Sequence, residues 1–264
     1  MRIATWNMKQ AIAPKKPLAE LWQWMDDTID PDVVVLTEAK VPADGVPDGW
    51  NAVWKEDGIG PYRRWGTVIA ARDDVELRDV TYGVPGADGF SVSHVWPGAV
   101  SIVDVVVDGD IVLTVVGLYA ITVDLDGNSI GNGMVSVPAI LTSLEDLFSS
   151  PRGDRLVIAG DFNLFPQDMP DFLYDNFIDV VAGTSDLRGP LDGCTGCDVA
   201  PDDCGHMWTH KNGNSPNAAV MNIDYIFASN SFENSVLDVY GGVGDFKEAW
   251  DVSDHAPVVL ELEV

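Results

Sequence analysis

The stretch Leu156-Val-Ile-Ala-Gly-Asp-Phe-Asn163 joins an apolar run to a turn that carries a carboxylate and an amide. A short apolar run next to glycine is consistent with a buried strand that ends in a sharp change of direction. Taken alone, Gly160-Asp-Phe-Asn163 is consistent with a plain turn. The stretch is more informative because the same arrangement, an apolar run next to polar residues, recurs along the chain.

At four other places, polar side chains stand at an end of an apolar run. They are Asn7 after Ile3–Trp6, Glu38 and then Lys40 after Val33–Thr37, Asn222 and Asp224 before Tyr225–Phe227, and Asp254 with His255 before Pro257–Leu262. Each one alone is explained by a turn, a strand end or a surface loop. Their joint occurrence predicts one polar site assembled from distant segments.

The remaining apolar runs predict many strands and few helices. Further strands are expected at Thr67–Ala70, Ser101–Val107 and Ile111–Val116, with a hairpin at Asp108-Gly-Asp110. Helices are expected at Pro17–Ile29, Val137–Phe148 and Met169–Asn176. This order favours an α/β protein of stacked sheets with helices outside. No linker or repeat divides the sequence, so we expect one domain over residues 1–264.

The chain is strongly acidic, with 42 Asp and Glu against 15 Lys and Arg and a net charge of −27. Such a field repels polyanions and argues against tight DNA binding through a basic surface. A phosphate substrate is still compatible, because bound metal cations reverse the local sign. No apolar stretch could span a bilayer, and Met1–Asn7 is typical of a strand and not of a signal peptide. We therefore expect a cytoplasmic monomer without membrane insertion.

The polar positions, in this order, resemble the endonuclease/exonuclease/phosphatase superfamily with its deoxyribonuclease I-like fold. The motifs that carry the resemblance are Thr5-Trp-Asn7, Leu36-Thr-Glu-Ala-Lys40, Trp65-Gly-Thr-Val-Ile69, Gly160-Asp-Phe-Asn163, Ile223-Asp-Tyr-Ile-Phe227 and Ser253-Asp-His255. The resemblance implies a four-layered α/β sandwich, dependence on Mg²⁺ or Mn²⁺, and cleavage of a phosphate ester. A hard cation prefers carboxylate and carbonyl oxygens, so Glu38 is the best metal ligand, helped by Asn7 and Asp254.

The resemblance also suggests roles for the catalytic candidates. Asp161 would orient or deprotonate the attacking water, and Asn163 would hold the phosphate or that water. His255, oriented by Asp224, would either carry positive charge beside the phosphoryl oxygens or act as a general base. The sequence leaves these two roles for His255 open.

Glu38-x-Lys40 and Tyr119 resemble AP endonucleases in particular. Tyr119 could hydrogen-bond a phosphate oxygen or the leaving group, or be a half-buried aromatic residue. Lys40 could contact a phosphate or be a solvated tip. Thr122 and Asn222 stand where relatives carry Asn and often Arg, which weakens the case for a duplex-DNA repair nuclease. Asn222 is retained as a possible phosphate contact.

Three cysteines form a cluster within a loop insertion around residues 192–210. Cys194-x2-Cys197-x6-Cys204-x-His206 offers four zinc ligands, and His210 is an alternative fourth. The alternatives are unrelated thiols, or one disulfide and a free thiol. A zinc ion here would hold the loop in a fixed conformation and take no part in catalysis.

Three functions compete. The pattern favours a nuclease acting on DNA or RNA, because of Glu38-x-Lys40 and Tyr119. The alternative is a phosphatase or phosphodiesterase acting on a small-molecule or lipid phosphate ester. A non-catalytic binding module is disfavoured, because the central polar positions are intact. Modest basic groups (Lys9 with Lys15 and Lys16, Lys55, Arg63-Arg64, Lys211) and the aromatic residues Trp54, Tyr62, Trp65 and Trp208 could contact a nucleic acid.

Overall fold

A computed structural model describes residues 1–11, 14–56, 58–59, 65–81, 96–122, 128–129, 131–180, 207–213, 215 and 217–264. The first sheet contains β1 (Arg2–Asn7), β2 (Val33–Ala39), β3 (Trp50–Trp54), β4 (Gly66–Arg72), β13 (Val236–Gly241) and β14 (Val258–Leu262). The second contains β5 (Glu76–Asp79), β6 (Val100–Val107), β7 (Asp110–Tyr119), β8 (Leu156–Asp161), β9 (Phe177–Asp179) and β12 (Asp224–Ser229). The strand orders are β13-β14-β1-β2-β4-β3 and β5-β6-β7-β8-β12-β9.

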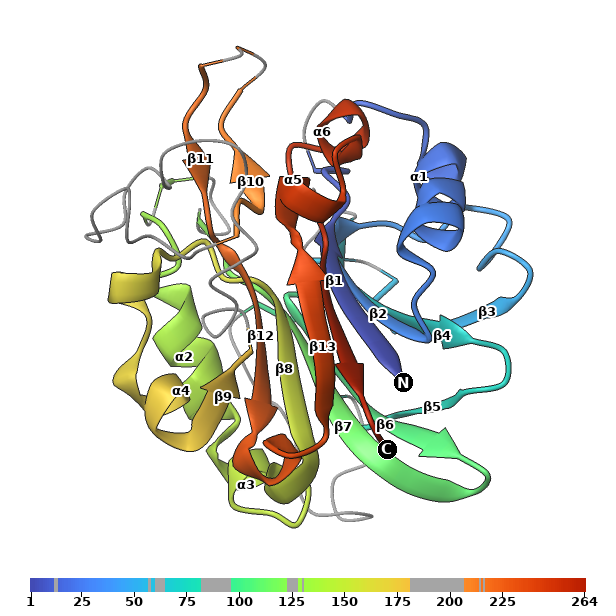
Figure 1. The fold of residues 1–264 in the computed structure, drawn as a ribbon, viewed down its shortest axis with the longest axis vertical. Helices are drawn as coiled ribbons and strands as arrows, with labels where there is room; N and C mark the ends of the chain where they lie inside the picture. Colours follow the sequence, from blue (N-terminus) through green and yellow to red (C-terminus); the bar gives the residue numbers. More distant parts are fainter. Residues whose placement is uncertain are drawn as a thin grey trace.

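Short helices flank these sheets. They are α1 (Leu18–Trp24), which continues as a π-helical turn over Met25–Ile29, α2 (Ser136–Ser143), α3 (Glu145–Phe148), α4 (Asp171–Asn176), α5 (Gly242–Asp245) and α6 (Ala249–Val252). In Figure 1, α1 lies on one side of the strands, and α2 and α4 lie on the other. A small separate ladder, β10 (His210–Lys211) with β11 (Val220–Met221), stands at the same end of the molecule as α5 and α6.

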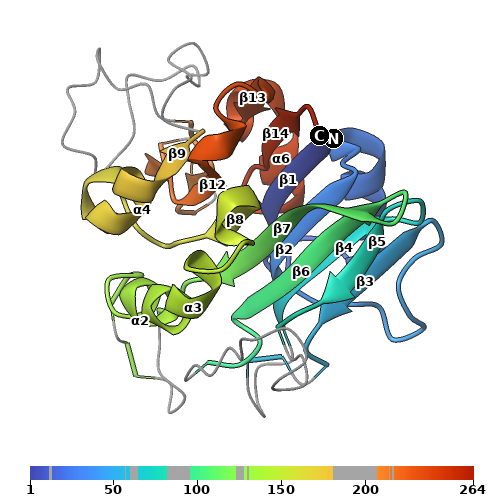
Figure 2. The same cartoon turned by 90° about the horizontal axis from the view of Figure 1, so that it is seen from below.

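Successive side chains of the apolar strands point to opposite faces of each sheet, and this alternation creates the layers. In β2, Val33 and Val35 face the core between the two sheets, while Val34 and Leu36 pack with α1 on the outer side. In β8, Val157 and Ala159 likewise face inward, and Leu156 and Ile158 pack with α2 to α4. Figure 2 shows α2 and α3 outside the sheet that contains β6, β7 and β8. The four-layered α/β sandwich predicted from the sequence is therefore confirmed.

Two parallel pairs bring strand ends together. β1 runs parallel to β2, and β7 runs parallel to β8, whereas the other pairs within the two large sheets are antiparallel. The carboxyl ends of β1 and β2 in one sheet and of β7 and β8 in the other carry Asn7, Glu38, Tyr119 and Asp161. Contacts between β1 and β8 and between β2 and β7 join the sheets there.

Gly160 is the tightest backbone position next to this edge. Its φ is 151°, and an added Cβ would lie 1.8 Å from the carbonyl oxygen of Leu118 on the neighbouring strand. We expect Gly160→Ala to lower the free energy of unfolding by more than about 3 kcal/mol. Gly109 is the matched control, because its φ of 92° is also left-handed but nothing lies within 4 Å of its Cβ position.

Gly109→Ala should lower the free energy of unfolding by only about 1–2 kcal/mol. Urea denaturation followed by circular dichroism measures both variants. Equal losses in the two variants would contradict the steric argument at Gly160.

Within the described parts of the chain, no helix combines the length and the apolar character needed to cross a bilayer.

Candidate active site

Strand register places three polar residues in one row across the second sheet. Tyr119 of β7 pairs with Asp161 of β8, and Asp161 pairs with Asp224 of β12. Residues in register on adjacent strands point to the same face, so their side chains are neighbours. All three are buried, although each lies at a strand end. The sheet thus builds a row of a phenol and two carboxylates that local sequence could not reveal.

A β-bulge directs Glu38 toward this row. The pairing of β2 with β4 shifts between Leu36 and Ala39, and Glu38 has a left-handed φ of 43°. A bulge re-aims a side chain and ends regular pairing. The Tyr119 hydroxyl donates a hydrogen bond of 2.9 Å to Glu38 Oε1, which connects the two sheets. Burial raises the pKa of Glu38, although the charge of His255 and the hydrogen bonds of Tyr119 and Asn7 oppose this shift.

Amide groups hold the Asp161 carboxylate on both oxygens. Asn7 Nδ2 donates to Oδ2 at 2.9 Å, and the backbone N–H of Asn163 donates to Oδ1 at 2.9 Å. The side-chain amide of Asn163 is itself held, because its Nδ2 donates to the carbonyl of Ala120 at 3.0 Å. Burial and the neighbouring charge of Asp224 raise the pKa of Asp161 to about 8, despite these hydrogen bonds and the charge of His255. A carboxyl with such a raised pKa is suited to proton transfer near neutral pH.

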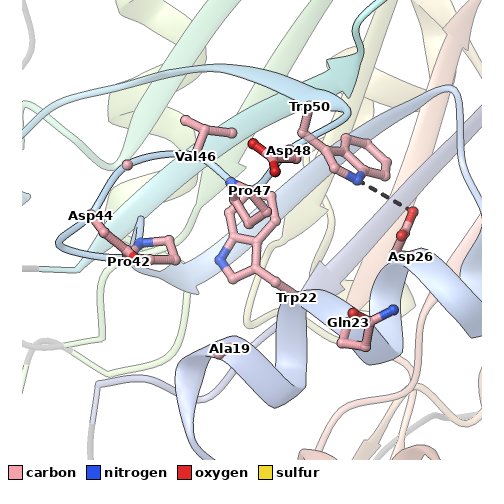
Figure 3. Close-up of a pocket in the computed structure, with 11 residues that line it drawn as sticks. Ala19, Trp22, Gln23, Asp26, Pro42, Asp44, Val46, Pro47, Asp48 and Trp50 are labelled. Atoms are coloured by element: carbon pink, nitrogen blue, oxygen red, sulfur yellow. Dashed lines mark hydrogen bonds between the residues drawn. The ribbon is translucent and has the colours of Figure 1, made fainter.

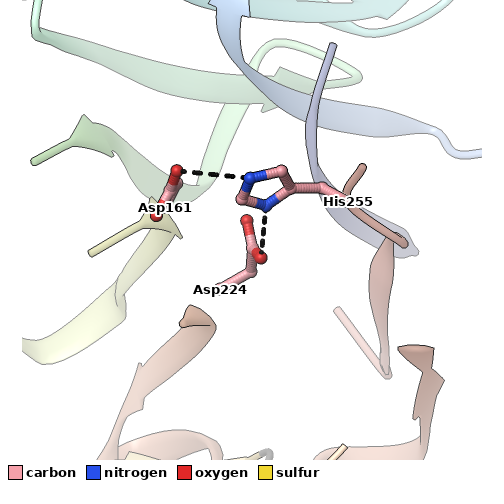
Figure 4. A group of neighbouring side chains, drawn as sticks. All are labelled: Asp161, Asp224 and His255. Carbon is pink, nitrogen blue, oxygen red and sulfur yellow. Dashed lines mark hydrogen bonds and ion pairs between the residues drawn. The ribbon is translucent and has the colours of Figure 1, made fainter. Parts of the chain in front are cut away.

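His255 lies between the two aspartates (Figure 4). Its Nδ1 is 2.9 Å from Asp224 Oδ2, and its Nε2 is 3.9 Å from Asp161 Oδ2. Burial alone would lower the pKa of His255, but the charge and hydrogen bond of Asp224, followed by the charges of Asp161 and Asp254, raise it to about 10. The imidazole is therefore cationic at neutral pH.

Backbone contacts fix the position of His255. Its N–H donates to Ser253 Oγ, and that hydroxyl donates in turn to the carbonyl of Asn7 at 2.8 Å. The indole of Trp6 donates to the carbonyl of His255 at 3.1 Å. The segment Ser253–His255 is thus tied to the end of β1, which explains why distant ends of the sequence meet at one site.

Asp254 makes an ion pair with a residue that sequence reasoning did not assign to the site. The ammonium of Lys9 pairs with Asp254 Oδ2, and Asp254 accepts a backbone hydrogen bond of 2.8 Å from Lys211. Burial would raise the pKa of Asp254, but the charge of His255 and the contact with Lys9 lower it below its usual value. Asp254 therefore remains ionised at neutral pH.

The donor set fits a hard cation. Four carboxylates meet at this edge (Glu38, Asp161, Asp224 and Asp254), and the cationic groups in contact with them are His255 and Lys9. The carboxylates of Asp161 and Asp224 come within 4.8 Å of each other and of the His255 ring, which as a cation offsets part of their charge and is not itself a ligand. In the described part of the chain, Asp224 Oδ1 is buried without a hydrogen-bond partner. A divalent cation would favour the ionised forms of Glu38 and Asp161, whose pKa values are raised by burial.

Backbone strain also concentrates here. Of the five described non-glycine residues with left-handed φ, three belong to this edge: Lys9, Glu38 and Asn163. The Asn7 side chain stabilises the first of them, because its Oδ1 accepts a hydrogen bond of 2.8 Å from the backbone N–H of Lys9. Such conformations cost about 1–3 kcal/mol each and cluster at functional sites.

The remaining predicted residues have different outcomes. Lys40 is half-buried and lines a cavity of about 290 Å³, together with Trp54, Lys55 and Trp65. This cavity borders the site, because the ring of Trp65 packs edge-on against Tyr119 at 5.1 Å. Asn222 is buried, and its Oδ1 has no hydrogen-bond partner in the described residues.

Cys194, Cys197, Cys204 and His206 lie outside the described residues, so the zinc hypothesis stays a prediction. His210 is described, and sequence reasoning considered it only as an alternative zinc ligand. Its ring centre lies 4.5 Å from that of His255, with the two ring planes tilted by 47°. Burial and the charge of His255 lower the pKa of His210 to about 3, so its imidazole is neutral.

A further cavity lies away from this site. It measures about 450 Å³ and is bounded by α1 and the segment between β2 and β3 (Figure 3). Asp26, Asp44 and Asp48 line it, along with Trp22 and Trp50. None of the candidate catalytic residues reaches it, and its carboxylates would repel a phosphate.

Two packed sheets with carboxylates, amides and an aspartate-bound histidine at one shared edge agree with a deoxyribonuclease I-like fold. The chain belongs to the Endonuclease/Exonuclease/phosphatase family, which it matches over residues 4–255. The comparison with curated proteins gives no match.

Solved structures share this fold at low sequence identity. An AP endonuclease from Archaeoglobus fulgidus is 17% identical with a TM-score of 0.66, and both chains are covered completely. An AP endonuclease from Leishmania major is 16% identical with a TM-score of 0.66, covering 100% of this chain and 87% of the other. A 3′ phosphatase from Neisseria, bound to a product DNA hairpin, is 18% identical with a TM-score of 0.60 and complete coverage of both chains.

Proposed function

We propose that the protein is a divalent-metal-dependent phosphodiesterase that acts as a nuclease on DNA or RNA by in-line attack of water. One observation carries this proposal. Glu38, Asp161 and His255 come from distant parts of the sequence, yet the Glu38–Tyr119, Asn7–Asp161 and His255–Asp224 contacts bring them to one edge. Carboxylates next to a fixed imidazolium suit the hydrolysis of a phosphate ester.

Glu38, Asn7 and Asp254 would hold the cation in this proposal. When bound, Mg²⁺ or Mn²⁺ would neutralise phosphate charge and lower the pKa of a coordinated water. The other roles belong to the chain itself. In its ionised form, Asp161 accepts the proton of the attacking water at Oδ2, where Asn7 keeps the carboxylate oriented.

Two more side chains complete the proposed mechanism. The imidazolium of His255, held by Asp224, stabilises negative charge on the phosphoryl oxygens. Its protonation at neutral pH supports this role over that of a general base. Asn163 keeps its side-chain oxygen available for the phosphate or the water, because its amide nitrogen is bound to Ala120.

A polynucleotide is favoured over a small phosphate ester by the cavity beside Tyr119. Trp54 and Trp65 are half-buried there, with Lys40 and Lys55 in the same lining. Aromatic faces next to cations suit bases and phosphates. The Neisseria structure, which contains a DNA product, agrees with this choice. Trp208, by contrast, is fully buried and packs in the core.

An activity panel tests the proposal. Purified protein, treated with EDTA and then supplied with Mg²⁺ or Mn²⁺, is assayed on single-stranded DNA, abasic duplex, RNA, bis-p-nitrophenyl phosphate and inositol phosphates. We expect cleavage of at least one nucleic acid, and a loss of at least about 100-fold when the metal is withheld. Activity that survives EDTA, or hydrolysis restricted to small phosphate esters, would contradict the proposed function.

A further inference from the structure

Three lysines gather beside the catalytic histidine, although they come from different segments. Lys9 follows β1 and pairs with Asp254. The Lys15 ammonium donates to the carbonyls of Trp250 and Ser253 at 2.5 and 3.0 Å. The Lys211 ammonium lies 4.9 Å from the ring centre of Trp250. We call Lys9, Lys15 and Lys211 the lysine cluster.

The lysine cluster reverses the charge pattern of the chain. Acidic residues outnumber Lys and Arg by 42 to 15 in the sequence, yet here three ammonium groups share a small region. The negative charges that act on the Lys15 ammonium are the carboxylates of Asp254 and Asp251. Burial lowers the pKa of Lys15, the charge of Asp254 opposes this, and Lys9 and Lys211 lower it further. Mutual repulsion of this kind is relieved when an anion binds.

The three side chains are also held in place before any ligand arrives. All are half-buried, and each ammonium contacts a carboxylate, a carbonyl or an aromatic ring of the segment that contains α6 and Asp254. Lys9 adopts its left-handed backbone under the control of the Asn7 side chain. Groups ordered in advance lose less conformational entropy when they bind.

The lysine cluster adjoins the reacting centre. The backbone N–H of Lys211 donates to the carbonyl of Asp254. The preceding His210 forms a β-bridge with His255, and their ring centres lie 4.5 Å apart. A substrate phosphate next to His255 would therefore place its neighbouring groups over these lysines. The opposite side of the site, at Glu38 and Tyr119, leads instead to the cavity with Trp54 and Trp65.

We propose that Lys9, Lys15 and Lys211 form a subsite for a second phosphate group of the substrate, next to the phosphate that reacts. This inference rests on the proposed phosphodiesterase function and narrows its substrate to a molecule with at least two phosphates. A nucleic-acid strand provides them in series, and a polyphosphorylated inositol provides them on one ring. The acidic remainder of the surface repels both, so the subsite offsets that repulsion locally.

Lys15→Gln and Lys211→Gln, alone and together, test the subsite, while Lys9 is kept because it contacts a proposed metal ligand. The readout is the ratio of kcat/KM on a short single-stranded oligonucleotide to kcat/KM on bis-p-nitrophenyl phosphate, which has a single phosphate. Each substitution should lower this ratio about tenfold. The slope of log KM against log salt for the oligonucleotide should fall by about 0.7 per lysine.

Arg78→Gln is the matched control, because it removes the same charge from β5, where Arg78 is exposed and paired with Glu76. It should change the ratio by less than about twofold. Melting temperatures of all variants show whether they remain folded. An unchanged ratio and an unchanged salt slope in the folded double variant would overturn the subsite.

A binding measurement separates this inference from the proposed function. On an Asp161→Asn background, fluorescence anisotropy follows a labelled oligonucleotide, and inositol bisphosphate is added as competitor. If binding of either ligand weakens when the lysines are substituted, the subsite is supported. If both ligands bind equally well with and without the lysines, the subsite is overturned. If the wild-type protein cuts no nucleic acid but inositol bisphosphate binding depends on the lysines, the nuclease proposal fails while the subsite stands.

Discussion

Asp161→Asn is expected to lower kcat by about 1,000-fold or more on every substrate that the wild-type protein hydrolyses. The asparagine keeps the size of the side chain and an oxygen for the Asn163 N–H, but it cannot accept a proton from water. Because the loss concerns proton transfer, it should be similar for bis-p-nitrophenyl phosphate and for an oligonucleotide. Steady-state kinetics with saturating Mg²⁺ measures it, and a loss of less than about tenfold would contradict the role of Asp161.

The stability of this variant provides an independent check. Burial of the Asp161 carboxylate is unfavourable, as its raised pKa shows, so replacing it should leave the melting temperature of metal-free protein within about 4 °C. Asp104 is the matched control, since it is a buried carboxylate that binds Arg152 and Thr114 instead of site residues. Asp104→Asn should cost about 3 kcal/mol of stability with little loss of kcat.

The contrast between these two aspartates shows what the sequence could and could not reveal. Asp161 was predicted as functional because it ends an apolar strand within Gly160-Asp-Phe-Asn163. Its pairing with Asp224 depends on strand register, and its hydrogen bond with Asn7 joins residues 154 positions apart. Local patterns contain no information on either contact. Sequence reasoning therefore found the carboxylates but not their geometry.

Lys9 and His210 were not predicted as parts of the reacting edge for the same reason. Lys9 reaches Asp254 across 245 positions, and His210 meets His255 through a β-bridge. One local signal existed for Lys9, since it stands two residues after Asn7 in a position that an asparagine side chain can bond. The short β10 gave no periodic signal from which to place His210.

The fold shows a similar division. Strands buried on both faces, such as β2 and β8, were predicted because their apolar runs are continuous. The strands β3, β5, β9 and β13 of the two large sheets were missed, and all four lie at sheet edges, where half-exposed positions admit polar residues. The helix expected over Val137–Phe148 is divided at Leu144, whose φ of −103° and ψ of 5° separate α2 from α3. Buried leucines continue through the break, so periodicity hid it.

His255→Gln is expected to lower kcat by about 100- to 1,000-fold, because the fixed imidazolium no longer offsets charge on the phosphoryl oxygens. Asp224→Asn should act on the same step, since Asp224 orients the ring and keeps it protonated. The two residues work as a unit, so the double variant should be little worse than His255→Gln alone. Additive losses would contradict this coupling.

The pH dependence of kcat distinguishes a cationic His255 from a general base. The pKa of His255 is raised to about 10, so the protonated form persists through neutral pH and is lost as the pH rises through that value. The proposed mechanism predicts that kcat rises through about pH 8 as Asp161 loses its proton and falls above about pH 10 as a cationic His255 loses its own, and that Asp224→Asn moves this fall toward neutral pH. A base predicts the opposite, a rate that rises as His255 loses its proton. In Asp224→Asn an uncharged amide replaces the carboxylate that contacts the His255 ring, so burial favours the neutral form of the ring. The pH at which kcat falls should therefore drop by more than about one unit. The assay uses bis-p-nitrophenyl phosphate and must resolve an about tenfold change in rate.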